Sequence, residues 1–263
     1  MFLSVSFYLT NKKMKIDLNC DVGETYFDRL VGKDAQLMPL ISSCNIACGF
    51  HGGDPKTIEN TLLLAAKHQV QVGAHPSFPD LENFGRTYMR LSSEELKACL
   101  RYQIAALQGM AKLQGVPLAH VKPHGALYNA AAVDFDLAVQ VAEVIQEFDL
   151  LFVGMAQSEM EKAAQHVQLP FVREAFADRS YTNQGTLLPR DQPNAVLTDL
   201  SLVVEQSLNI VQMGRAVSSN NGEIPIVADT LCVHGDTKNA LELLMALRAA
   251  FENHGIRVKA FSQ

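Results

Sequence analysis

The sequence lacks any long run of basic residues. Its 22 Lys and Arg residues are scattered, no cluster of them is longer than Lys12–Lys13, and the formal net charge is −6. Nucleic-acid binding depends on a concentrated positive surface, so no nucleic-acid partner is expected. No apolar run reaches the roughly 18 residues of a membrane-spanning helix, so no membrane span is expected either.

Cysteines are few and unpaired. The five are Cys20, Cys44, Cys48, Cys99 and Cys232, an odd and scattered set. This usage is typical of a reducing compartment rather than of a disulfide framework, so we expect a cytoplasmic protein. Cys44 and Cys48 lack the CxxC spacing of a zinc site, and burial is their expected role.

Several familiar catalytic motifs are absent as well. There is no HExxH helix, no GxSxG turn and no Walker A loop. The absence of GxSxG argues against a covalent acyl-enzyme. Cys20 and Cys48 lie close to the polar segments described below and leave a cysteine nucleophile open as a minor alternative.

What the sequence does contain is a regular alternation of short apolar segments and amphipathic helices. Hydrophobic residues make up 48% of the 263 residues, enough for a sizeable core. Strands are expected at 14–19, 41–47, 70–74, 117–122, 150–154, 170–174, 224–233 and, more weakly, 256–260. This pattern predicts one α/β domain over 14–263, an irregular barrel of seven or eight mostly parallel strands, with a doubly wound sheet as the alternative. Residues 1–13 are expected to be a dispensable extension.

Three of the expected helices carry recognisable start signals. Asp54-Pro55 combines an N-cap with a proline in the first turn, and Ser92–Glu95 forms a capping box. Asp236 is expected to cap the last long helix. The poorly patterned segment 177–200 is expected to be an active-site loop or lid.

Histidines collect where the expected strands end, the edge at which parallel α/β folds build their sites. Four of the eight occupy this position on four different strands: His51, His75, His124 and His234. The others lie within or at the ends of helices and strands and are expected to be structural: His68, His120, His166 and His254. Four equivalent placements predict one shared pocket.

Other polar side chains accompany these histidines. The acidic and amide residues are Asp17, Asn19, Asp21, Glu24, Asn45, Glu174, Asp178 and Asp236. Lys122 is a candidate electrophile or oxyanion partner, and Arg86 and Arg179 are candidates for holding an anionic substrate. Such a set suits a metal-activated water, and it equally suits metal-free acid–base chemistry.

Seven segments of the sequence resemble the LamB/YcsF family, whose members are described as the A subunit of bacterial 5-oxoprolinase. They are DLNCDVGE (17–24), SCNIACGFHGGDP (43–55), VGAHPSFPD (72–80), FGR (84–86), VKPHGALYN (121–129), EAFADRSY (174–181) and CVHGD (232–236). They follow the order of the family from residue 14 to about 260, so the resemblance covers nearly the whole chain.

The resemblance implies a β/α barrel of the glycoside hydrolase/deacetylase type. It also implies a part in the ATP-dependent hydrolysis of 5-oxo-L-proline (pyroglutamate) to L-glutamate, with ADP and phosphate as products. The implied partners are 5-oxoprolinase subunits B and C, which would share ATP and Mg with this chain. A homo-oligomer is left open.

The resemblance and the strand-end pattern together assign expected roles. The residues expected to be catalytic are Asp17, Asp21, His51, His75, Lys122 and His124, with Asp17 or Asp21 orienting an imidazole. The residues expected to bind substrate or phosphate are Asn19, Glu24, Asn45, Arg86, Glu174, Arg179, His234 and Asp236. Whether a metal is bound is left open; if one is present, Asp17, His51 and His124 are its expected ligands. Two alternative functions are a metal-dependent deacetylase of an N-acetylated sugar and a non-catalytic substrate-binding subunit.

Overall fold

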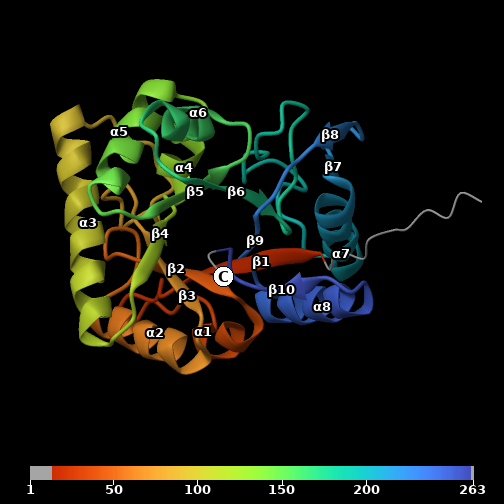
Figure 1. The fold of residues 1–263 in the computed structure, drawn as a ribbon, viewed down its shortest axis with the longest axis horizontal. Coiled ribbons are helices and arrows are strands. Elements are labelled where there is room, and N and C mark those ends of the chain that lie inside the picture. The colour runs from red at the N-terminus through yellow and green to blue at the C-terminus, as the bar shows by residue number, and fades with distance from the viewer. Residues whose placement is uncertain (1–13, 262–263) are drawn as a thin grey trace, which may run out of the picture.

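The computed structural model describes residues 14–261 (Figure 1). The extension expected at 1–13 lies outside the described residues. Within the described part of the chain, no helix combines the length and the apolar character needed to cross a bilayer.

Seven parallel strands close into a barrel. In order around it they are β1 (Lys15–Val22), β2 (Ser43–Ala47), β3 (Gln71–His75), β4 (Leu118–Val121), β5 (Leu151–Met155), β6 (Phe171–Phe176) and β9 (Thr230–His234). Pairing of β1 with β9 closes the ring. An eighth parallel strand, β10 (Arg257–Val258), pairs with the amino end of β1. The expected irregular barrel is confirmed, and the doubly wound alternative is wrong.

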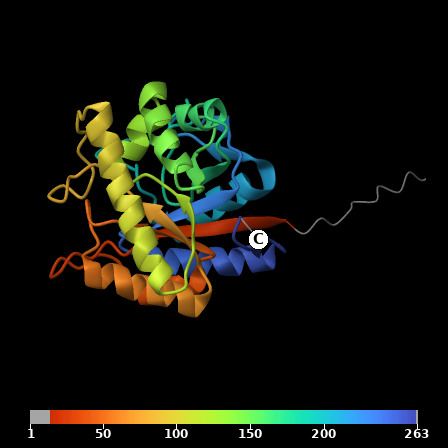
Figure 2. The ribbon, with the colours of Figure 1, turned by 60° about the vertical axis from the view of Figure 1, so that its left-hand side comes forward.

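Helices surround the barrel on its outside (Figures 1 and 2). They are α1 (Asp34–Leu37), α2 (Pro55–His68), α3 (Ser93–Leu113), α4 (Gly125–Ala131), α5 (Phe135–Gln146), α6 (Glu159–His166), α7 (Leu200–Leu208) and α8 (Ala240–Asn253). A 3-10 turn, Met38–Leu40, follows α1, and a π-helical turn, Asn209–Met213, follows α7.

The strand expected at 224–233 is in fact two elements. Its first residues belong to β8 (Glu223–Pro225), which forms an antiparallel hairpin with β7 (Arg215–Val217) outside the barrel. Only Thr230–His234 enters the barrel, as β9. A single strand is broken here because Pro225 has no N–H to donate to a continued ladder.

Two of the three expected helix starts are confirmed. The Asp54 carboxylate accepts hydrogen bonds from the N–H groups of Lys56 and Thr57. Ser92–Glu95 forms the full capping box at the start of α3.

The third expected helix start, at Asp236, is wrong. Helix α8 begins at Ala240, after Asn239. The Asp236 carboxylate forms an ion pair with Arg86 instead of capping the helix. A sequence pattern cannot reveal this contact because Arg86 lies 150 residues earlier in the chain.

Strand β1 shows how the barrel wall is built. Its side chains alternate between two faces. Ile16, Leu18, Cys20 and Val22 belong to the buried hydrophobic core. The alternate residues, Asp17, Asn19 and Asp21, are equally buried and make polar contacts with other barrel strands. The barrel interior is therefore polar along this strand rather than filled with branched apolar side chains.

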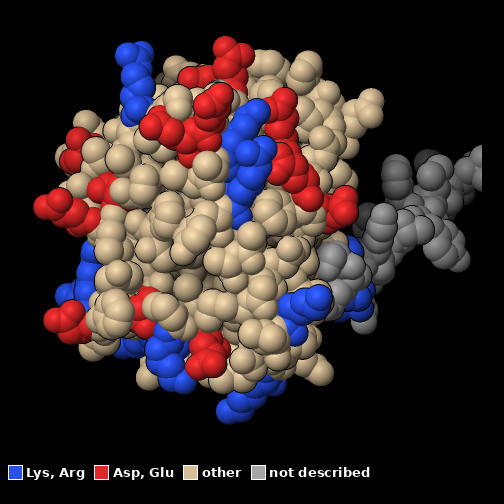
Figure 3. Space-filling view, turned by 90° about the vertical axis from the view of Figure 1, so that its left-hand side faces the viewer, with Lys and Arg blue, Asp and Glu red and all other residues tan. Residues whose placement is uncertain are grey.

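The face covered by α3 carries mixed charges (Figure 3). Lys97 and Arg101 of α3 pair with Glu143 and Glu147 of α5. Such exposed pairs contribute at most about 1 kcal/mol each, so they fasten the two helices only weakly.

Candidate active site

The lowest layer of the polar interior is centred on Asp17. The hydroxyl groups of Ser42, Ser43 and Thr230 donate hydrogen bonds to its carboxylate. Burial outweighs these bonds and raises the pKa of Asp17 to about 6. The hydrogen-bond partners of Asp17 are hydroxyl groups and not an imidazole. Of the two carboxylates expected to orient an imidazole, Asp21 is therefore the better candidate.

Two asparagines form the next layer and hold the carboxylates above it. The side-chain amide of Asn19 donates to Glu174 at 3.0 Å. The amide of Asn45 donates to Asn19 at 2.9 Å and to Asp21 at 2.8 Å. His120 contacts the Asn45 oxygen at 2.8 Å, and burial lowers the pKa of this histidine to about 3. The two asparagines thus position Glu174 and Asp21, and His120 in turn holds Asn45. This contact is consistent with the structural role expected for His120.

Lys122 lies at the centre of the site with every N–H group engaged. Its Nζ is 2.9 Å from Asp21 Oδ1, 2.9 Å from Glu174 Oε1 and 3.1 Å from Cys232 Sγ. Burial opposes its positive charge, but the nearby Asp21 outweighs burial, and the pKa of Lys122 is raised. The ammonium is therefore a permanent cation that neutralises two buried carboxylates.

The cysteines near the site are thiols rather than thiolates. Burial raises the pKa of Cys48 to about 12 and raises the pKa values of Cys20 and Cys232 well above the usual value. All five cysteines are free. The thiolate is the reactive form, so these environments do not favour a cysteine nucleophile.

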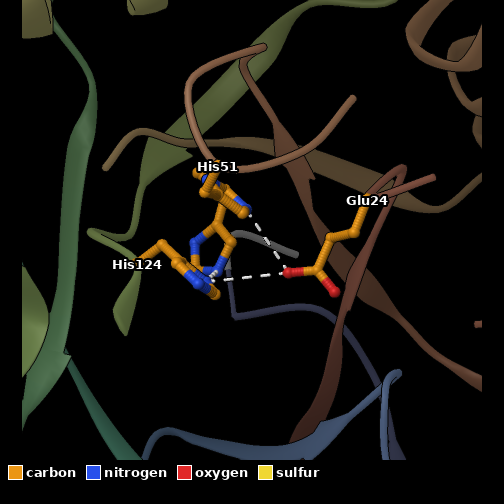
Figure 4. Close-up of side chains that lie close together, drawn as sticks. Glu24, His51 and His124 are labelled. Carbon is orange, nitrogen blue, oxygen red and sulfur yellow. Dashed lines mark hydrogen bonds and ion pairs between the residues drawn. The ribbon is translucent and has the colours of Figure 1, made fainter. Parts of the chain in front are cut away.

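Three of the four strand-end histidines lie close to one carboxylate. Figure 4 shows two of them, His51 and His124, beside Glu24. Glu24 Oε1 lies 3.4 Å from His51 Nε2 and 3.6 Å from His124 Nδ1. His75 Nε2 lies 3.0 Å from His124 Nδ1 and 3.4 Å from Asp21 Oδ2. The imidazole-orienting contact expected of Asp17 or Asp21 is thus made by Asp21.

The burial of this cluster sets its charges. Burial lowers the pKa values of His51 and His124 well below the usual value. Burial and the negative charge of Asp21 raise the pKa of Glu24. For Asp21 itself, burial would raise the pKa, but the contact with His75 and the charge of Lys122 outweigh burial and hold its pKa well below the usual range. The cluster therefore combines the neutral imidazoles of His51 and His124 with the ionised carboxylate of Asp21.

These groups include the candidates for holding a metal. The possible ligand atoms of Glu24, His51, His75 and His124 all lie within 4.8 Å of one another. Asp17, an expected metal ligand, is not part of this group. Glu24, expected to bind substrate, takes its place.

His234, the fourth strand-end histidine, belongs to a separate group. Its Nδ1 lies 2.9 Å from Asp178 Oδ1, and its ring stacks on Phe176. Burial opposes ionisation of Asp178, but His234 outweighs it and lowers the pKa of that carboxyl.

A pocket of about 400 Å³ opens above these groups at the carboxyl ends of the strands. Its lining includes Asp21, His75, Lys122, His124, Tyr128, Arg179 and His234. Thr186–Arg190, within the segment expected to be a loop or lid, forms another part of the wall. That segment therefore borders the pocket, as expected.

Three arginines line the same pocket, and they differ in what they can do. Arg179 donates to the backbone oxygens of Leu188 and Ala195, so it holds the loop in place. Burial lowers the pKa of Arg179 to about 10, which still leaves it charged. Arg86 and Arg190 both face Asp236. Sequence reasoning missed Arg190, because it lies in a segment without any periodic pattern.

The comparisons with known proteins agree with this architecture. A family model described as "LamB/YcsF family" matches residues 16–263. The chain belongs to the LamB/YcsF family. A protein of Acinetobacter baylyi, named as the A subunit of 5-oxoprolinase, is 46% identical over 252 residues, covering 95% of this chain and 99% of the relative. A Bacillus subtilis protein of the same name is 43% identical and covers 95% and 98%.

Two solved structures superpose on this LamB/YcsF chain. A lactam utilization protein from Thermus thermophilus superposes with a TM-score of 0.89 at 44% identity, covering 94% of this chain and all of that one. A putative cellobiose-phosphate cleavage protein from Enterococcus faecalis superposes with a TM-score of 0.58 at 12% identity, covering 95% and 98%. The second similarity concerns the fold alone.

Proposed function

We propose that this chain is the A subunit of a cytoplasmic, ATP-dependent 5-oxoprolinase. Its pocket would take part in the hydrolytic opening of 5-oxo-L-proline to L-glutamate, together with partner subunits B and C. The observation that carries the proposal is the convergence of His51, His75 and His124 on one carboxylate beside the arginine-bearing pocket. The names of the relatives, at 42–46% identity over nearly the full chain, supply the substrate.

The proposed reaction needs an activated ring because a lactam is a stabilised amide. In this scheme the γ-phosphoryl group of ATP, with Mg, is transferred to the lactam carbonyl oxygen and ADP is released. Water then adds to the carbonyl carbon and the ring C–N bond breaks, which leaves an acyl phosphate on the opened chain. A second water hydrolyses this acyl phosphate, which gives L-glutamate and phosphate. The partner subunits would help to activate the ring, and this chain would direct the water.

The side chains divide these tasks by charge. Neutral imidazoles can accept a proton from water, and general-base catalysis of this kind is typically worth about 10²–10⁴ in rate. His75 and His124 reach the pocket and are the candidate bases. Asp21 orients His75, and Lys122 is held in place by its two carboxylate partners. Arg86 and Arg190 would bind the carboxylate of the substrate or its phosphate.

The test is glutamate release from 5-oxoproline and ATP with this chain and subunits B and C, and then with each component omitted. We expect release only when this chain is present. Full release without it would contradict the proposal.

A metal-dependent deacetylase is the second candidate, because the group formed by Glu24 and the histidines is suited to a metal. Acetate release from an N-acetylated sugar, without ATP and with sensitivity to a chelator, would support it. A third outcome, normal partner binding with turnover unaffected by substitutions in the pocket, would indicate a non-catalytic binding role.

A further inference from the structure

The hydrogen bonds of His75 and His124 determine which nitrogen of each ring carries its proton. His75 Nδ1 lies 2.7 Å from the backbone oxygen of Lys122, and His124 Nε2 lies 2.9 Å from the backbone oxygen of Phe84. A carbonyl oxygen only accepts, so each of these nitrogens must donate an N–H group. When the rings are neutral, the other two nitrogens, His75 Nε2 and His124 Nδ1, carry no proton and each presents a lone pair.

These two bare nitrogens face each other. His75 Nε2 and His124 Nδ1 are 3.0 Å apart. Two lone pairs at this distance repel unless a positive species lies between or beside them. Histidines that bind metals almost always donate their second ring nitrogen to a carbonyl or a carboxylate, as both rings do here.

Glu24 places a carboxyl group at the same point. Its carboxylate is buried, and its polar contacts among residues 14–261 are with His51 and His124. No hydroxyl or backbone N–H group in that range donates to it. A buried carboxylate without a donor is costly, and a bound cation removes that cost.

The spacing of these atoms suits a small tetrahedral ion. Ligand atoms 2.0–2.1 Å from a tetrahedral zinc lie roughly 3.3 Å from one another. The two pairs measured here, His75 to His124 and His124 to Glu24, are 3.0 and 3.6 Å apart. Imidazole nitrogen with carboxylate oxygen is a ligand set typical of zinc.

His51 has a different position from the other two histidines. Its ring lies parallel to that of His124, with centroids 3.8 Å apart and 3° between the planes. An ion in the plane of His124 therefore lies outside the plane of His51 and cannot meet its lone pair well. Neither ring nitrogen of His51 has a hydrogen-bond partner, and Nε2 faces Glu24. His51 is thus placed to orient Glu24.

We propose that Glu24, His75 and His124 bind one divalent transition-metal ion of the zinc class, and that His51 holds Glu24 in position. Three protein ligands leave a coordination position for water, as in catalytic zinc sites. The test of this metal site does not require 5-oxoprolinase activity. A bound ion would take the lone pairs of His75 and His124, and its water would then replace these rings as the candidate base. This ligand set differs from the one expected from the sequence, which included Asp17. The Asp17 carboxylate instead accepts hydrogen bonds from three hydroxyl groups.

The test is metal uptake by the untagged, full-length chain. The protein is stripped with a chelator, incubated with Zn²⁺ or Co²⁺, desalted and analysed by mass spectrometry for metal content. We expect about one ion per chain, and Co²⁺ should give the strong visible bands of a low-coordinate site. Glu24→Gln and His124→Gln should each weaken Zn²⁺ binding by more than tenfold, and His51→Gln by about ten- to a hundredfold.

His166→Gln is the control, because this histidine lies on the exposed surface of α6, outside the groups of possible ligand atoms. It should bind the ion normally. Circular dichroism establishes that each variant is folded. No uptake by the wild-type protein would overturn the proposal, as would unchanged uptake by folded Glu24→Gln and His124→Gln. Imidazole ¹⁵N NMR showing a proton shared by His75 and His124 in a protein that takes up no metal would assign the positive species as that proton instead.

Discussion

The imidazole rings of His51 and His124 are stacked, with 3.8 Å between their centroids. They come from loops that follow β2 and β4, and they meet only because the barrel brings these strand ends together. Two imidazolium rings this close in a buried site would repel each other strongly. The pair therefore carries at most one positive charge, which keeps one ring available as a base or a ligand.

His124→Ala should lower turnover of 5-oxoproline by about 10²–10⁴-fold in the reconstituted enzyme, because it removes a candidate base. The measurement is glutamate release at saturating substrate with the partner subunits present. His166→Ala, on the exposed surface of α6, is the control and should retain full activity. Full activity of a folded His124→Ala protein would rule out its catalytic role.

Lys122→Met should destabilise the fold by about 3–5 kcal/mol, because it leaves the Asp21 and Glu174 carboxylates buried without their cation. Urea unfolding at neutral pH measures the change. Lys97→Met removes an ion pair at the surface and should change the free energy of unfolding by less than about 1 kcal/mol. Similar values for the two variants would contradict this account of Lys122.

Gly85→Ala should disturb the histidine cluster. Gly85 has a φ of +67°, and a Cβ atom there would lie 2.8 Å from the His124 ring and 2.9 Å from His51 Cβ. We expect a loss of about 1–3 kcal/mol in stability together with reduced turnover. Gly109→Ala, in α3 with open space around it, should instead stabilise the protein by up to about 1 kcal/mol. Wild-type stability and turnover in Gly85→Ala would show that the loop adjusts freely.

Asp54 should make stability depend on pH in the acidic range. Burial would raise its pKa, but hydrogen bonds from Thr57, Phe27 and Lys56 outweigh burial and lower the pKa to about 2. The stabilisation is fully present above the unfolded pKa of 3.8 and is lost as the pH falls towards 2.

Urea unfolding of the wild type and of Asp54→Ala tests this dependence. The difference between them should be about 1–2 kcal/mol at pH 6 and should shrink by about 1 kcal/mol at pH 3. A difference that stays constant between these pH values would show that the charge of Asp54 does not contribute.

Arg86→Ala should weaken binding of an anionic substrate. A hydrogen bond to a charged group is worth about 1.5–3 kcal/mol, so KM for 5-oxoproline should rise by about 10- to 100-fold with a smaller change in kcat. Steady-state kinetics of the reconstituted enzyme measure both constants. Arg101→Ala removes an arginine from the outer face of α3 and should leave both unchanged. An unaltered KM in Arg86→Ala would exclude Arg86 from substrate binding.

Local features of the chain were readable from the sequence because their physical causes are local. Alternating apolar segments predict strands, and Asp54 and the Ser92–Glu95 box mark helix starts through hydrogen bonds to nearby backbone groups. The polar residues that follow the strands predicted the edge of the barrel at which the pocket lies. The seven family segments predicted the family, which the comparison confirmed.

The tertiary structure decided which of these polar residues meet. Asp17 and Asp21 are four residues apart on β1, so they are separated by about 13 Å along the strand and lie in different layers of the barrel. Only Asp21 reaches the histidines. Cys232 reaches Lys122, and Asp236 reaches Arg86, across more than 100 residues of chain. Such contacts depend on closure of β1 against β9, and no short stretch of sequence carries that information.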